Sequence, residues 1–129
     1  MISQTAEKIL ARPLKADEGI SPAVMEEAET RLGIKLPYIL KEYYTSVGNN
    51  TLFMNEHIRF AMPDELYTED GKLVFLEENQ CVCMWAVDLK EMGYDNPTVY
   101  MLVESDDGNA WFPEEIPLAE FLRLMLYYQ

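Results

Sequence analysis

Apolar side chains recur at helical spacing in the first third of the chain. Val24, Ala28 and Leu32 repeat every four positions, and charged residues occupy most of the positions between them. Such an apolar stripe is typical of an amphipathic helix. The pattern therefore predicts a helix over residues 22–32, which Gly33 ends because glycine readily adopts the left-handed conformation at this position.

A second helical pattern follows four residues later. Ile39, Tyr43 and Val47 align on one face behind Pro37, a residue that suits the start of a helix. We expect a helix over residues 37–47, and two helices joined by so short a segment form a helical hairpin. A shorter helix is predicted before it, over residues 4–11.

After Asn50 the pattern becomes typical of strands, with β-branched and aromatic residues in short runs. Asp70 and Gly71 form a strong hairpin signal between two of these runs, and Asp106 to Asn109 indicate another turn. The connections are short, which favours an antiparallel meander. The predicted strands cover residues 51–60, 72–77, 81–87 and 98–104.

The last pattern predicts a C-terminal helix that begins after Pro117 and runs to residue 128. The predicted fold class is α+β: an N-terminal helical hairpin, an antiparallel sheet and a C-terminal helix packed on the sheet. The strands at 81–87 and 98–103 are apolar on both faces, so both faces of the sheet's centre should be covered. The predicted core contains Ile39, Leu40, Tyr43, Val47, Phe121, Leu122 and Met125.

Length and composition indicate one globular domain over residues 1–129. Hydrophobic residues make up 49% of the chain, a proportion typical of folded proteins. No apolar run is long enough to span a membrane, and the N-terminus lacks the features of a signal peptide. We therefore expect a cytoplasmic protein with reduced thiols.

The net charge is −13, and it is concentrated in one half of the chain. Residues 1–64 contain seven Lys or Arg and nine Asp or Glu, whereas residues 65–129 contain three and fourteen. Binding to DNA, RNA or an anionic membrane requires a cationic surface, so these partners are not expected. The charge favours a basic protein partner. The alternative is that it serves solubility alone.

The two cysteines, Cys81 and Cys83, point to the same face of a predicted strand with Cα atoms about 6.6 Å apart, which would strain a disulfide. A metal site would need more ligands, and His57 is the only histidine. We predict unbridged thiols, no metal, no cofactor and no catalytic residues. A small hydrolase that uses two carboxylates or the Cys/His pair stays as an alternative.

Four segments together resemble the pattern of a known family. They are ISPAVMEEAETRLGIKLPYILKEYY (20–44), the Gly48-Asn49 pair, FLEENQCVCMWAV (75–87) and the F-L-x-x-M-L pattern of the closing helix (121–126). In this combination the chain resembles the SUKH superfamily, also called the Smi/Knr-type domain, over residues 20–128. The helix–Leu-Gly-Ile-x-Leu-Pro–helix element and the E-N-Q-x-x-x-x-W segment are its most specific parts.

The resemblance implies a binding protein. Bacterial members of the superfamily are mostly immunity proteins that bind a cognate secreted toxin, often a nuclease, and they are not known as enzymes. Fungal members are regulators with long disordered arms, which these 129 residues lack, so the bacterial type is favoured. A general interaction or regulatory domain without a toxin partner is the alternative.

The expected partner-binding residues are acids that fall at turns or strand ends of the second half. Charge at such positions costs the fold little and attracts a basic partner. Asn79 and Gln80 are interpreted as structural, and Trp85 as a core residue. The predicted partner-binding residues are Glu69, Asp70, Glu77, Glu78, Asp106 and Asp107.

Overall fold

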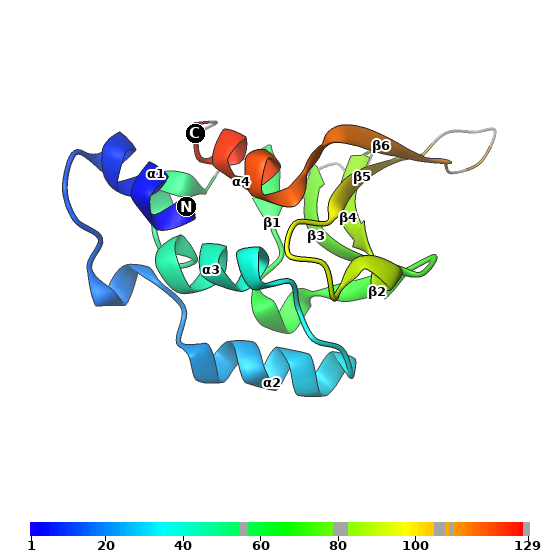
Figure 1. Ribbon diagram of the computed structural model, residues 1–129, viewed down its shortest axis with the longest axis horizontal. Coiled ribbons are helices and arrows are strands. Elements are labelled where there is room, and N and C mark those ends of the chain that lie inside the picture. The colour runs from blue at the N-terminus through cyan, green and yellow to red at the C-terminus, as the bar shows by residue number, and fades with distance from the viewer. Residues whose placement is uncertain (55–56, 79–82, 105–107, 109, 128–129) are drawn as a thin grey trace.

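The computed structural model describes residues 1–54, 57–78, 83–104, 108 and 110–127. An antiparallel sheet lies on one side of the molecule and the α-helices lie on the other, as Figure 1 shows. The predicted α+β class is confirmed. The elements are α1 (Ile2–Leu10), α2 (Pro22–Leu32), α3 (Tyr38–Val47), β1 (Ile58–Phe60), β2 (Tyr67–Glu69), β3 (Lys72–Glu78), β4 (Cys83–Asp88), β5 (Thr98–Val103), β6 (Ala110–Pro117) and α4 (Leu118–Tyr127).

Helix α2 begins and ends where its sequence predicts. Ser21 Oγ accepts a hydrogen bond from the Ala23 N–H at 3.3 Å, and Gly33 ends the helix with a φ of 71°. Its buried face differs from the prediction, because Met25 and Ala28 are buried whereas Val24 is exposed. Figure 1 shows the reason: α2 lies at the edge of the molecule, so only a narrow stripe of it is covered.

The hairpin between β2 and β3 is confirmed. Asp70 and Gly71 have φ values of 54° and 74°, and this pair of left-handed residues matches the twist of the two strands. Strands β3, β4, β5 and β6 then form a consecutive antiparallel meander. The short strands β1 and β2 both pair with β3, so together they make one interrupted edge of the sheet.

Three strand predictions need correction. Strand β2 lies in a segment that was interpreted as a loop or a single helical turn. The predicted strand over 51–60 is shorter, because Asn50 Oδ1 accepts the Leu52 N–H at 2.8 Å and caps a 3-10 turn over Thr51–Phe53. Strand β6 was not predicted at all. Its sequence contains Pro113, which has no N–H to donate and is tolerated because β6 is an edge strand.

The main core lies between the sheet and helices α1, α3 and α4. A β-bulge between Val74 and Leu76 lets both Phe75 and Leu76 pack in this core. Phe121 of α4 meets the ring of Phe75 edge-on at 6.0 Å. The predicted core is confirmed, with Met125 only partly buried against it and the other predicted members buried: Ile39, Leu40, Tyr43, Val47, Phe121 and Leu122.

A buried carboxylate ties the N-terminal segment to the end of α3. Glu18 is 9% exposed, and both of its oxygens accept hydrogen bonds from the Arg12 guanidinium, at 2.7 and 3.0 Å. Asn50 Nδ2 and the Lys15 N–H also donate to it. The Arg12 side chain, followed by the Lys15 N–H, lowers the pKa of Glu18 to about 2.

Replacing Glu18 with glutamine should therefore destabilise the fold at neutral pH and matter less in acid. A carboxylate whose pKa is lowered by folding stabilises the protein above its unfolded pKa of about 4.3, and this contribution disappears as the pH falls toward 2. The measurement is the urea midpoint of Glu18→Gln and of the parent protein from pH 7 to pH 3. The difference between them should shrink with acidification, and a difference that stays constant would contradict the linkage.

The matched control is Glu27→Gln. Glu27 is an exposed acid on α2. Its replacement should leave the urea midpoint close to that of the parent protein throughout this pH range.

Candidate functional site

The face of the sheet that points away from the helices carries a second, smaller apolar cluster. Val74, Met84, Ala86 and Leu102 are buried there, from three neighbouring strands. The side chains that pack over them, within the described part of the chain, come from the sheet itself, from Tyr67 of β2 and Trp111 of β6. We call this surface the outer sheet face and define it by Tyr67, Glu69, Lys72, Val74, Met84, Ala86, Tyr100, Leu102 and Trp111. The prediction that both faces are covered holds, but aromatic side chains rather than helices cover this one.

A lysine lies over two aromatic rings of the outer sheet face. The Lys72 Nζ is 5.2 Å from the ring centroid of Tyr100 and 5.2 Å from that of Trp111. Both distances are within the range of a cation–π interaction. The Trp111 Nε1–H donates to Asp70 Oδ2 at 3.2 Å, across 41 residues of sequence. The β2–β3 turn is thereby joined to the opposite edge strand.

Acidic side chains surround this lysine. Glu69 and Asp88 are its partners in the registers of β2 and β4, and Asp70 follows Glu69 in the turn. Burial raises the pKa of Tyr100, and the charges of Glu91 and Asp88 raise it further. Among the described residues, Glu69 Oε2 is a buried oxygen without a hydrogen-bond partner. The outer sheet face is therefore aromatic at its centre and acidic around it.

The structure separates the predicted partner-binding residues into two groups. Glu69 and Asp70 lie on or beside the outer sheet face near Lys72. Glu77 and Glu78 lie at the far end of β3, where Glu77 is the partner of Met84 on that same face. Being consecutive in a strand, Glu77 and Glu78 point to opposite faces of the sheet. Asp106 and Asp107 lie outside the described residues, as do Asn79 and Gln80.

Cys83 is a free thiol at the far end of the sheet from the β2–β3 turn, and Cys81 lies outside the described residues. Burial raises the pKa of the Cys83 thiol, and a hydrogen bond and charge from Glu78 and the charge of Glu114 raise it further. Such a setting opposes formation of the thiolate, which is the nucleophilic form. Trp85 packs 6.3 Å from the ring of Phe121 and donates from Nε1 to Glu114 Oε1 at 3.2 Å, in agreement with its interpretation as a core residue.

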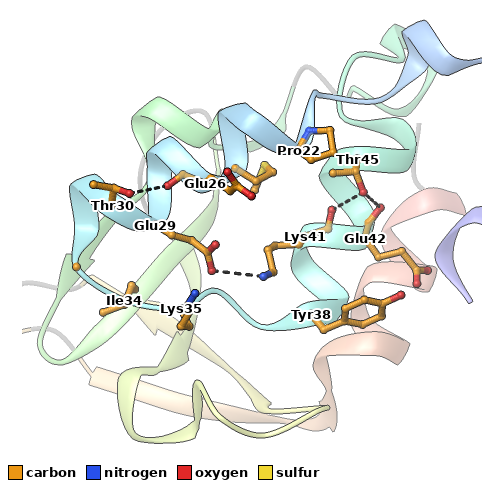
Figure 2. Close-up of a pocket in the computed structure, with 12 residues that line it drawn as sticks. Pro22, Glu26, Glu29, Thr30, Ile34, Lys35, Tyr38, Lys41, Glu42 and Thr45 are labelled. Carbon is orange, nitrogen blue, oxygen red and sulfur yellow. Dashed lines mark hydrogen bonds and ion pairs between the residues drawn. The ribbon is translucent and has the colours of Figure 1, made fainter.

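An open groove of about 780 Å³ lies between α2 and α3. Figure 2 shows Glu29 and Lys41 joined across it, with an Oε2–Nζ distance of 3.4 Å. Glu29 Oε2 also accepts the Leu36 N–H at 2.7 Å, and Glu42 Oε1 accepts the Ile2 N–H at the same distance. These two carboxylates hold parts of the backbone together, so they serve the fold.

The described part of the chain contains no group of three or more His, Cys, Asp or Glu side chains placed to hold a metal ion. Nor does it contain a helix with the length and apolar character needed to cross a membrane. Comparison of the chain with known protein families, with curated proteins and with solved structures gives no match.

Sequence reasoning did not find the arrangement of Lys72, Tyr100 and Trp111. The alternation of Lys72 with Val74 and of Tyr100 with Leu102 places each pair on one face of a strand, which was a usable signal. No strand was predicted around Trp111, so the sequence did not assign this residue to a face of the sheet.

Proposed function

We propose that this protein is an immunity-type binding module that binds and neutralises a basic toxin domain, such as a nuclease. The sequence resemblance to the SUKH superfamily supports the proposal. A nuclease is basic around its phosphate-binding cleft, because it must attract a polyanion. An acidic protein that covers this cleft would block the substrate.

The observation that carries the proposal is the uncompensated acidic charge of the second half of the chain. Residues 65–129 contain three basic residues and fourteen acidic ones. Two of the three cations are partly covered: Lys72 lies over aromatic rings, and the Nε of Arg123 is buried. Lys90 is exposed. The acids that the structure places on the exposed surface of this half include Asp70, Asp95, Glu104, Glu115 and Glu120.

Such a charge distribution acts mainly on the rate of association. Opposite charges on two proteins steer their encounter, and association then becomes faster at low salt. Screening over about 8–10 Å at ordinary ionic strength weakens this steering, so the rate should fall as salt rises. The proposal predicts that a toxin domain is encoded beside the gene of this protein, and the first experiment is co-purification of the two. Failure of the two to associate at low salt would refute the proposal.

Reversing the charge of four predicted residues should slow association with that toxin domain sharply. The variant carries lysine at Glu77, Glu78, Asp106 and Asp107. We expect the association rate at low salt to fall by about tenfold or more, because steering changes rates by factors of about 10 to 1,000. The measurement is stopped-flow association at low and at high salt, where the difference from the parent protein should nearly vanish.

The control variant carries the same change of charge in the other half of the chain. Asp17, Glu26, Glu27 and Asp64 are all exposed and lie in residues 1–64. Their replacement with lysine should slow association much less if the second half faces the toxin. Equal slowing by the two variants would show that net charge acts without a defined binding face.

A further inference from the structure

The outer sheet face is built like the centre of a binding interface. Trp111, Tyr100 and Tyr67 are partly buried there, and Trp and Tyr are residue types that dominate binding energy in interfaces. Their backbone is fixed in paired strands, and each side chain has only two χ angles to order on binding. Figure 1 shows the α-helices on the other side of the sheet, so no helix in the described part of the chain lies over this face.

Lys72 shows that this face can hold a cation. Its ammonium lies at the same distance, 5.2 Å, from the centroids of two rings that come from neighbouring strands. The protein's own cation therefore occupies a site made by two aromatic residues. Lys72 has a long flexible side chain and is only partly buried, so it can turn out toward solvent without a change in the strand.

An arginine would use this site more fully than Lys72 does. A guanidinium is planar, stacks on aromatic rings and donates in pairs to carboxylates, whereas an ammonium does not. Glu69 and Asp88 are the cross-strand neighbours of Lys72, and the Asp70 carboxylate accepts the Trp111 indole N–H. Glu69 Oε2 is buried and has no hydrogen-bond donor among the described residues, so Lys72 does not satisfy this oxygen.

The geometry points to the outer sheet face as the docking site for an arginine side chain of the basic partner, which displaces Lys72 from between Tyr100 and Trp111. This inference rests on the proposed function, because it specifies where and how the basic protein is held. Lys72 acts as an internal competitor. Its removal frees the two rings and should strengthen binding.

The first test uses a tetra-arginine peptide with blocked ends and the Lys72→Gln variant. Glutamine keeps much of the lysine stem and removes its charge. We expect the peptide to bind Lys72→Gln about fivefold more tightly than the parent protein, as loss of one competing cation–π interaction implies. The measurement is a nuclear magnetic resonance titration of the ¹⁵N-labelled protein, in which the Trp111 indole and the Tyr100 amide should shift most.

The matched control is Lys90→Gln, which removes the same charge from an exposed position in the same half of the chain. It should change the affinity for the peptide by about twofold or less, because it alters only the long-range electrostatic attraction between protein and peptide, which salt screens. Equal effects of the two variants would overturn the inference, and so would peptide-induced shifts confined to the region of Glu78 and Glu114.

Two further measurements distinguish specific recognition of arginine from general attraction of a positively charged peptide. A tetra-lysine peptide should bind several-fold more weakly than tetra-arginine, because it lacks the stacking surface. Trp111→Leu, which keeps an apolar cover on Leu102, should remove this preference while circular dichroism shows the variant folded. Equal binding of the two peptides to the parent protein would refute an arginine site.

The toxin domain distinguishes this inference from the function on which it rests. If the four-lysine variant slows association but Lys72→Gln and Trp111→Leu leave it unchanged, the partner binds another acidic surface and only the inference fails. If the toxin domain does not bind and the arginine peptide still prefers Lys72→Gln, the proposed partner is wrong and the arginine site stands.

Discussion

Replacing Leu122 with alanine should lower the free energy of unfolding by about 2–5 kcal/mol. Leu122 is fully buried in α4, among the side chains that join this helix to the sheet and to α3. The truncation removes apolar surface from the core and leaves a cavity that rigid neighbours fill only in part. Denaturant unfolding followed by circular dichroism measures the change.

Leu124 supplies the matched control in the same helix. It is 49% exposed, two residues from Leu122 on the other side of α4. Its truncation to alanine should change the free energy of unfolding by about 0.5 kcal/mol or less. If Leu122→Ala also falls below about 1 kcal/mol, α4 does not pack on the sheet as described.

Replacing Gly19 with alanine should destabilise the protein by about 3 kcal/mol or more, at the upper end for overpacked sites. A Cβ at Gly19 would lie 1.7 Å from the carbonyl oxygen of Thr45 and 2.5 Å from its carbonyl carbon. Neither atom belongs to a flexible side chain, so the segment before α2 and helix α3 must move apart. That movement would disturb the bond from the Ile20 N–H to the Tyr44 carbonyl, at 2.9 Å.

Gly93→Ala is the control for Gly19→Ala. No atom lies within 4 Å of a Cβ built at Gly93, and its φ is not in the left-handed region. The substitution should change the free energy of unfolding by about 0.5 kcal/mol or less. If Gly19→Ala is fully folded and its free energy of unfolding is unchanged, the backbone at Gly19 does not approach that of Thr45 as closely as described.

The Gly19 contact and the Glu18 network stabilise the same junction in different ways. Glu18 binds the side chains of Arg12 and Asn50, and the next residue brings its backbone against α3. This junction orients α1 and the segment before α2 relative to the main core. None of its residues belongs to the outer sheet face, so variants of the junction test stability and leave the proposed docking surface in place.

Local patterns along the sequence determined most of the elements. The apolar spacing of α3 and α4, the glycine that ends α2 and the Asp70–Gly71 turn each act over a few residues, so each was predictable without knowledge of the fold. The charge asymmetry is likewise a property of composition. These features carry the α+β class and the proposal of a basic partner.

The outer sheet face was decided only by the tertiary structure. Lys72, Tyr100 and Trp111 come from three strands, and they meet because the pairing registers of β3 to β6 place them on one face of the sheet. Strand β6 is stable only because it pairs with β5, and its own sequence, with Pro113, argues against a strand. Pairing between distant segments depends on the whole sheet, and no local pattern contains it.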